Sequence, residues 1–282
     1  MDWGKHKAHW PHADHSRFVP AGTGRWHVQE MGQGPTLLLI HGAGGATQSW
    51  RHLMPLLSRT HRVIAIDLPG QGFSKPRAPG RFGLDQMARD LWDLMQGQGW
   101  EPKAIIGHSA GAAVALRVSE LARPAPWKVI GLNAALAPFK GVAGWAFPMA
   151  AKAMALNPLT APMVAATSNK QSVTRILDST GSKLDDDGLA LYARLVGSAS
   201  HVNGTLRMMA NWSLDGLLNR LPQNTVETVL IVGENDGTVP AGTSDAAAAR
   251  MPNAHVLRLP NLGHLAHEEA PETVLEAVLS EL

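Results

Sequence analysis

The chain has 282 residues, enough for one large α/β domain, or two small ones, with a sizeable core. Its 45% hydrophobic and 17% charged residues are typical of a globular protein, and 25 basic against 23 acidic residues give a formal net charge of only +2. This near-neutrality excludes a dense basic surface, so we expect no nucleic-acid partner, and the absence of cysteine excludes disulfides, thiolate catalysis and cysteine-ligated zinc.

The N-terminal segment is polar and rich in histidine. His6, His9, His12 and His15 recur every three residues, but Pro11 interrupts any helix that would gather their rings on one face. We therefore expect a solvated, mobile terminus there rather than a metal or tetrapyrrole site. The segment lacks the apolar run of a secretory signal, and the chain has no stretch of about twenty uncharged apolar residues. These features favour a soluble, cytoplasmic protein.

Short apolar runs alternate with longer helical stretches along most of the chain. The alternating segment Arg25–Glu30 predicts an antiparallel edge strand. Buried strands are predicted at Thr36–Ile40, Val63–Asp67, Ala104–Ile106, Val129–Leu132, Val229–Val232 and His255–Leu259. Helices are predicted at Leu84–Met95, Gly111–Leu121 and Pro271–Leu282. This alternation predicts an α/β fold with a mostly parallel, doubly wound sheet covered on both faces.

One long segment, from Pro138 to Leu221, breaks the alternation of strands and helices. It shows only helical patterns, which Pro148, Pro158 and Pro162 interrupt. A structureless loop of this length is improbable in a compact domain. We therefore expect a helical cap, residues 138–221, inserted into a core domain made of residues 1–137 and 222–282.

The first half of this predicted cap, about residues 138–170, is rich in Ala, Met and Pro and poor in charge. We expect a mobile apolar lid whose inner face includes Trp145, Phe147 and Met149 and lines a substrate pocket, because methionine adapts to irregular ligands. The same side chains are equally consistent with the core of the cap. A face this apolar also suits peripheral contact with a membrane, or with a partner protein.

A candidate nucleophile lies in the sequence Gly107-His108-Ser109-Ala110-Gly111, which matches the pattern G-x-S-x-G. It stands between a predicted strand and a helix of small residues, where a sharp turn lifts a serine Oγ clear of the sheet. The N-terminus of that helix adds partial positive charge where an oxyanion would form. Ser109 is therefore predicted to be a nucleophile.

Two further residues complete a candidate catalytic triad. Asp236 follows the predicted strand Val229–Val232, and His264 follows the predicted strand His255–Leu259. All three residues fall at the carboxyl edge of a parallel sheet, where such sheets place their sites. The turn His41-Gly42-Ala43-Gly44-Gly45 can offer the N–H of Ala43 to an oxyanion, with the N–H of Ala110 as the second donor.

Other polar residues near the triad have less specific interpretations. Asn133 follows a predicted strand but cannot carry the charge that an imidazolium needs, so we assign the acid to Asp236. His108 and His267 are expected to pack or hydrogen-bond beside the site. Glu234 and Glu269 are expected to be solvated or to support the site indirectly.

These motifs resemble the α/β-hydrolase superfamily over nearly the whole chain. The matching segments are HGAGG (residues 41–45), DLPGQGFS (67–74), GHSAG (107–111), GEND (233–236) and LGH (262–264). The order Ser, Asp, His is the order of this superfamily. One departure is Gln71, where the family more commonly has His or Arg. A serine rather than an aspartate at the elbow disfavours epoxide and haloalkane chemistry.

A closer resemblance is to the magnesium-chelatase accessory hydrolases of bacteriochlorophyll biosynthesis. It rests on Trp10-Pro11 and on SRFV (16–19), RWHVQ (25–29), GHSAGAA (107–113), LNAALAPF (132–139), MMANW (208–212) and LGHLAHEE (262–269). The resemblance implies an esterase-like serine hydrolase acting on a bulky apolar substrate in a tetrapyrrole pathway, with magnesium-chelatase subunits as partners and no metal or organic cofactor. The alternative is a non-catalytic porphyrin-binding accessory that assists magnesium chelatase.

Overall fold

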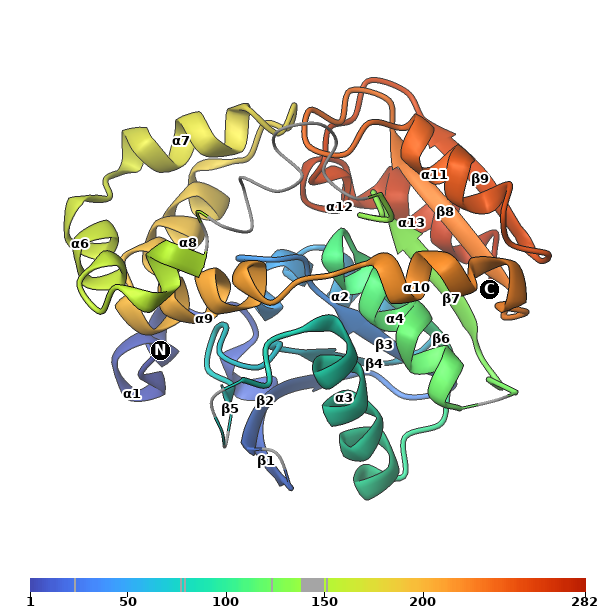
Figure 1. Cartoon of the computed structure of the whole chain (residues 1–282), viewed down its shortest axis with the longest axis horizontal. Helices are drawn as coiled ribbons and strands as arrows, with labels where there is room; N and C mark the ends of the chain where they lie inside the picture. Colours follow the sequence, from blue (N-terminus) through green and yellow to red (C-terminus); the bar gives the residue numbers. More distant parts are fainter. Residues whose placement is uncertain (23, 77, 79, 123, 138–149, 151) are drawn as a thin grey trace.

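The computed structural model describes residues 1–22, 24–76, 78, 80–122, 124–137, 150 and 152–282. A central sheet carries helices on both faces, and a group of helices lies to one side of it (Figure 1). The strands are β1 Ser16–Ala21, β2 Gly24–Met31, β3 Thr36–Ile40, β4 Arg62–Ile66, β5 Lys75–Pro76, β6 Pro102–His108, β7 Lys128–Leu132, β8 Thr228–Gly233 and β9 Ala254–Leu259. The helices are α1 Trp3–His6, α2 Leu53–Leu57, α3 Leu84–Gln98, α4 Ala110–Leu121, α6 Thr160–Thr167, α7 Lys170–Asp178, α8 Asp186–Val196, α9 Ala199–Ala210, α10 Asp215–Arg220, α11 Gly242–Ala248, α12 Ala266–Glu269 and α13 Pro271–Leu279.

The sheet has the strand order β1-β2-β4-β3-β6-β7-β8-β9, with β5 paired to β2. Strands β4 to β9 along this order run parallel, whereas β1 and β2 are antiparallel to their neighbours. From β3 the chain adds β4 on one side and later β6 on the other side, so the order in which strands are added reverses at β3. Open α/β sheets place their sites at the carboxyl ends of strands around such a reversal.

The predicted α/β class is confirmed, and each predicted strand is present, with bounds shifted by only one or two residues at most ends. One position in the sheet was predicted wrongly. The segment Arg25–Glu30 lies in β2, which is antiparallel but not an edge strand, because β1 pairs along its outer side from Ser16↔Gln29 to Ala21↔Gly24. Pro20 lies within β1 and interrupts its pattern of alternating apolar and polar residues, so the sequence does not indicate this strand.

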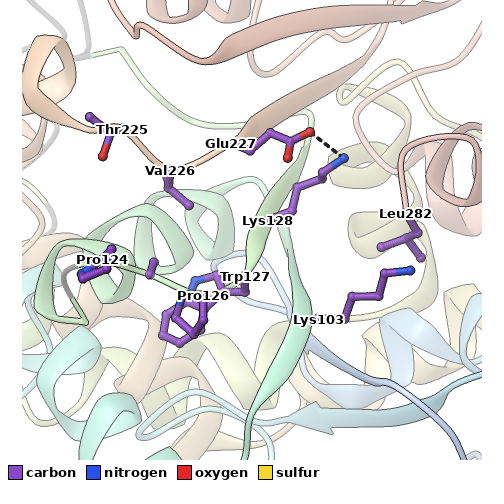
Figure 2. Close-up of a pocket in the computed structure, with 10 residues that line it drawn as sticks. Lys103, Pro124, Pro126, Trp127, Lys128, Thr225, Val226, Glu227 and Leu282 are labelled. Carbon is purple, nitrogen blue, oxygen red and sulfur yellow. Dashed lines mark ion pairs between the residues drawn. The ribbon is translucent and has the colours of Figure 1, made fainter.

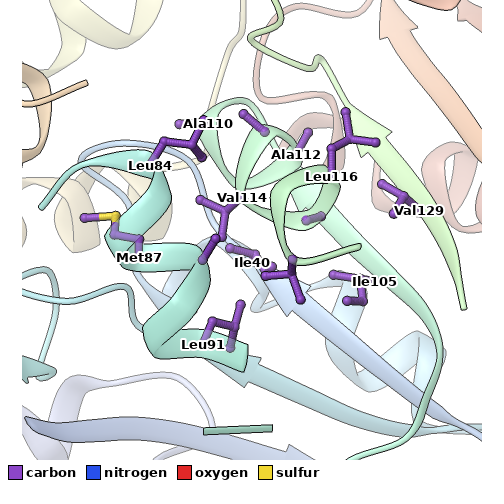
Figure 3. Close-up of a cluster of buried hydrophobic side chains, with 14 of the residues drawn as sticks. Ile40, Leu84, Met87, Leu91, Ile105, Ala110, Ala112, Val114, Leu116 and Val129 are labelled. Atoms are coloured by element: carbon purple, nitrogen blue, oxygen red, sulfur yellow. The ribbon is translucent and has the colours of Figure 1, made fainter. Parts of the chain in front are cut away.

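Alternate residues of the central strands point into two separate apolar layers. Leu38 and Ile40 of β3 pack with α3 and α4 on one face (Figure 3), while Leu37 and Leu39 pack with α2 and α13 on the other. All four side chains are at most 1% exposed. Burial on both faces explains why these strands are continuous apolar runs, and it holds the sheet rigid beneath its carboxyl edge.

The expectation of a mobile N-terminus is wrong. Trp10 is only 4% exposed, and its indole N–H donates to Thr47 Oγ1 at 3.1 Å. The rings of Trp3 and Trp10 pack edge-on against Phe73, with ring centroids 4.8 and 4.7 Å away. His12 Nε2 hydrogen-bonds to the Arg51 carbonyl at 2.8 Å. Burial of Trp10 and partial burial of Trp3 outweigh the polarity of the surrounding residues, because each ring removes a large apolar area from water.

The helices α6 to α10 follow β7 in the chain and precede β8. Helix α6 packs against α9, and α7 packs against α8. The division into a core domain and a cap at residues 138–221 remains our proposal. Trp145, Phe147 and Met149 lie outside the described residues. Within the described part of the chain, no helix has the length and apolar character needed to cross a bilayer.

Candidate active site

Ser109 occupies a sharp turn between β6 and α4. Its backbone has φ 52° and ψ −117°, a conformation that costs a non-glycine residue energy and is therefore held by its surroundings. Its N–H donates to the Leu132 carbonyl at 2.9 Å. A Cβ on Gly107 would lie 2.5 Å from Ala112 N, and one on Gly111 would lie 2.2 Å from Ile40 O. Both glycines are required because the turn packs backbone against backbone.

Asp236 and His264 form a close pair at the carboxyl ends of β8 and β9. His264 Nδ1 lies 2.7 Å from Asp236 Oδ2, and the two side chains are 8% and 1% exposed. The other oxygen, Oδ1, accepts the N–H groups of Thr238 and Val239 at 2.7 and 2.8 Å. These bonds fix the carboxylate in one orientation. If Nδ1 donates to this carboxylate, Nε2 is the ring nitrogen left to accept a proton.

Asn133 contacts the same carboxylate, a role that the sequence did not indicate. It has φ 48° after β7, and its Nδ2 donates to Asp236 Oδ2 at 2.8 Å. Asp236 Oδ2 thus accepts hydrogen bonds from both Asn133 and His264. The carboxyl ends of β7, β8 and β9 converge on this one oxygen.

The turn at residues 41–45 lies against the serine. A Cβ on Gly42 would lie 3.0 Å from Ser109 Cβ and 2.8 Å from His108 Nδ1. Ala43, the predicted oxyanion donor in this turn, is exposed, and Ala110, the other predicted donor, is the first residue of α4. Gly42, the residue before Ala43, thus lies against Ser109, while the oxyanion role of Ala43 and Ala110 remains our proposal.

The comparisons with known proteins agree with the fold. Residues 35–271 match the family model described as the alpha/beta hydrolase fold. The chain belongs to the α/β-hydrolase family. This α/β-hydrolase is 44% identical to the magnesium-chelatase 30 kDa subunit of Rhodobacter capsulatus over 96% of both chains. It is 28% identical to a pimeloyl-[acyl-carrier protein] methyl ester esterase of Nitrosomonas europaea, over 87% of this chain and 95% of that one.

Solved structures show the same fold. The epoxide hydrolase CorEH superposes with a TM-score of 0.79 at 21% identity, over 94% of this chain and 97% of that one. A thermophilic esterase from Thermogutta terrifontis superposes with a TM-score of 0.77 at 21% identity and the same coverage. The resemblance to the magnesium-chelatase accessory hydrolases, inferred from motifs, is confirmed by the identity to the Rhodobacter protein.

Both backbone polar groups of Gly44 in this α/β-hydrolase are hydrogen-bonded to side chains, which the sequence did not predict. Gln71 Oε1 accepts the Gly44 N–H at 2.6 Å, and His201 Nε2 lies 3.1 Å from the Gly44 carbonyl. His201 Nδ1 accepts the Gly72 N–H at 2.9 Å, so the ring proton is on Nε2 and points to Gly44. Burial lowers the pKa of His201 to about 4, which keeps this ring neutral at pH 7.

The chain just after α7 lies between the two loops that carry Asp236 and His264. The Thr180 carbonyl accepts the N–H of His264 at 3.1 Å and the N–H of Gly237 at 3.0 Å. Ser182 Oγ accepts the N–H of Leu265 at 2.8 Å. One segment that follows α7 therefore fixes the separation of both loops.

Two histidines pack behind His264, as predicted. The His108 ring lies 4.8 Å from the His264 ring and 4.5 Å from the His267 ring, measured between centroids. His108 Nε2 lies 2.9 Å from the His264 carbonyl and donates to it. Burial lowers the pKa of His267 to about 3 and the pKa of His108 well below its usual value. The rings of His108 and His267 are therefore neutral and add no charge behind His264, the candidate base.

A buried ionic cluster beside this stack was also missed from the sequence. Glu268 is 5% exposed and accepts from Tyr192 at 2.7 Å and from Arg51. Arg51 also donates to Asp185 at 3.0 Å. Burial raises the pKa of Glu268 to about 7 despite Arg51. The residues are separated by up to 217 positions in the chain, so no local pattern signals the cluster.

Of the remaining predicted neighbours, Glu269 accepts the Gly263 N–H at 3.0 Å, which supports the loop before His264 as expected. Glu234 is exposed. Among the described residues, no group of three or more His, Asp or Glu side chains is placed to hold a metal ion. A cavity of about 450 Å³ lies at the opposite edge of the sheet, lined by Trp127, Lys128 and Glu227 among others (Figure 2). It is separate from the triad.

Proposed function

We propose that this α/β-hydrolase is a serine hydrolase that cleaves a carboxylic ester, amide or thioester of a bulky apolar substrate through an acyl-enzyme. One observation carries the proposal: a buried carboxylate, Asp236, lies 2.7 Å from the imidazole of His264, at the sheet edge that presents Ser109. A structural role alone does not require a serine in a strained turn at the same sheet edge as a histidine paired with a carboxylate.

The mechanism follows from the residue types. His264 Nε2 accepts the proton of Ser109 Oγ while the oxygen attacks the substrate carbonyl, and Asp236 stabilises the imidazolium that forms. The N–H groups of Ala43 and Ala110 stabilise the oxyanion. His264 then protonates the leaving group, and water attacks the acyl-enzyme by the reverse sequence of proton transfers. The reaction uses no metal or organic cofactor.

Labelling with a fluorophosphonate tests the nucleophile directly. We expect the wild type to be labelled at Ser109 and to hydrolyse short p-nitrophenyl esters, whereas Ser109→Ala loses both properties and keeps its fold. Loss of a triad nucleophile typically lowers kcat by ~10⁶-fold. The control is Ser200→Ala, which changes an exposed serine on α9 and should behave as wild type. Retention of more than a few per cent of activity by Ser109→Ala would contradict the proposal.

The setting that we propose is a tetrapyrrole pathway, with magnesium-chelatase subunits as partners. It is supported by the 44% identity to a protein named as a magnesium-chelatase subunit. The same name favours a second candidate function, a non-catalytic accessory that binds a porphyrin and assists magnesium insertion. In that case the wild type would resist the fluorophosphonate and still bind porphyrin.

A titration with protoporphyrin, followed by quenching of tryptophan fluorescence, tests the tetrapyrrole pocket that both candidate functions require. We propose that Trp145, Phe147 and Met149 line the pocket, so Trp145→Ala and Phe147→Ala should weaken binding. If both variants bind as tightly as wild type, or if wild type binds no porphyrin, the tetrapyrrole pocket is wrong. The proposed triad is tested separately by the fluorophosphonate.

A further inference from the structure

The large apolar side chains that this protein exposes are concentrated in one short stretch. Among the described residues, the large hydrophobic side chains that are exposed are Leu156 (73%), Leu159 (71%), Met163 (61%), Ile176 (60%), Met154 (42%) and Leu279 (42%). All but Leu279 lie between residues 154 and 176. Single exposed apolar residues are normal on a protein surface, but a cluster of this kind marks a contact surface.

These side chains belong to the outer surface of α6 and α7 and of the chain before α6. Helix α6 buries Thr160 and Ala161 and packs on α9, while α7 buries Val173 and Leu177 and packs on α8. The inner faces of both helices are thus already covered. Figure 1 shows α6 and α7 at the left and upper-left periphery of the molecule, outside α8 and α9.

Within residues 152–176 every charged side chain is a cation, although Asp178 ends α7 and Asp186 lies on the neighbouring α8. The sequence has no acidic residue between Glu120 and Asp178. The described cations within or beside the apolar stretch are Lys152, Lys170 and Arg175, and all three are exposed. Lys170 pairs with Asp186 at 2.8 Å, but both side chains are more than half exposed, so water and salt weaken this pair.

We propose that the surface formed by Met154, Leu156, Leu159, Met163 and Ile176, with Lys152, Lys170 and Arg175, docks on an anionic lipid bilayer. Aliphatic side chains and methionine enter the boundary between headgroups and acyl chains, while lysine and arginine contact acidic headgroups. Protein interfaces instead favour tyrosine, tryptophan and arginine and are depleted in lysine. The described part of this surface has no aromatic side chain and two lysines, which favours lipid.

Docking in this way would place the bilayer on a helix, α7, that continues into the loops of the candidate active site. Helix α7 leads directly into Thr180 and Ser182, which hydrogen-bond to the loops of Asp236 and His264. The docking itself does not depend on the proposed hydrolase activity, because it uses residues outside the triad.

Flotation of the full-length protein with lipid vesicles tests the proposal. We expect binding to vesicles of phosphatidylglycerol and phosphatidylcholine in equal parts, little binding to pure phosphatidylcholine, and weaker binding as salt rises. The variant L156E/L159E/M163E should lose at least tenfold in affinity. Each of Lys152→Gln and Arg175→Gln should lower affinity about fivefold, which is the effect of one cation near a charged membrane.

The matched control is Leu279→Glu, which changes an exposed leucine on α13, remote from α6 in Figure 1. It should bind vesicles as wild type does. The proposal is overturned if wild type does not bind anionic vesicles, if it binds neutral vesicles equally well, or if Leu279→Glu loses as much affinity as the triple variant. Sedimentation velocity adds one more outcome: a wild-type dimer that the triple variant abolishes, without vesicle binding, would assign the surface to a second copy of the chain.

Discussion

At the scale of single residues, Asp236 and Asn133 share one contact but differ in charge. We predict that Asp236→Asn lowers kcat by ~10⁴-fold, because a neutral amide cannot stabilise the imidazolium. Asn133→Ala removes a hydrogen bond to the carboxylate at 2.8 Å. Its expected effect is roughly 10- to 100-fold, the range for one bond to a charged group. Steady-state kinetics with p-nitrophenyl acetate measures both. A larger loss of kcat in Asn133→Ala than in Asp236→Asn would show that our assignment of the catalytic acid to Asp236 is wrong.

His201 is expected to act through Gly44 rather than on the substrate. Replacing it with leucine removes the hydrogen bond to the Gly44 carbonyl, in the turn that also contains Ala43. We predict that His201→Leu lowers kcat by roughly 10- to 100-fold with little change in KM, because oxyanion donors act mainly in the transition state. Ser200→Leu, exposed on the same helix, should leave both constants unchanged. An equal loss in both variants would indicate damage to α9 instead.

At the scale of elements, the segment after α7 connects that helix to the loops of Asp236 and His264. Gly181 has φ +80°, and a Cβ there would lie 2.0 Å from the Asn235 carbonyl oxygen. We predict that Gly181→Ala lowers the free energy of unfolding by ~1–3 kcal/mol and also lowers kcat, because the Asp236 loop must move. Urea unfolding and ester hydrolysis measure the two effects.

The control for this substitution isolates backbone strain from the steric clash. Gly99 also has a positive φ, +61°, but a Cβ there meets nothing within 4 Å. Gly99→Ala should therefore lower stability by roughly 1 kcal/mol through strain alone and leave kcat unchanged. If Gly181→Ala keeps full activity, the segment after α7 does not position the triad.

At the scale of the whole molecule, buried histidines make stability depend on pH. The pKa values of about 4 for His201 and about 3 for His267 lie below the ordinary value of 6.5. The unfolded chain therefore binds more protons than the folded one between these values, so stability is full above pH 6.5 and is lost as pH falls towards 4. Each such histidine contributes a slope of up to about 1.4 kcal/mol per pH unit.

Glu268 acts in the opposite direction. Its pKa of about 7 exceeds the ordinary 4.5, so the stability it adds is present below pH 4.5 and is lost as pH rises through 7. We predict that urea unfolding shows a net loss of stability from pH 6.5 to pH 4.5, and that Glu268→Gln steepens this slope by up to about 1.4 kcal/mol per pH unit. A slope that Glu268→Gln leaves unchanged would contradict this account.

The sequence by itself determined the sheet and the presence of the predicted triad residues at its carboxyl edge. Runs such as Thr36–Ile40 identify strands because burial on both faces requires continuous apolar residues. Ser109 could be found because a strand-to-helix turn of this kind needs glycine at 107 and 111. These signals are local in the chain, so no knowledge of tertiary contacts was needed.

Only the tertiary structure decided which distant groups support the site. The bond of His201 to Gly44 spans 157 positions, and that of Arg51 to Glu268 spans 217. The histidines of the N-terminus gave no sign that Trp3 and Trp10 pack on Phe73. Such contacts depend on where folding brings two segments together, and a buried polar group is satisfied by whichever partner lies within reach. Local sequence patterns carry no information about that partner.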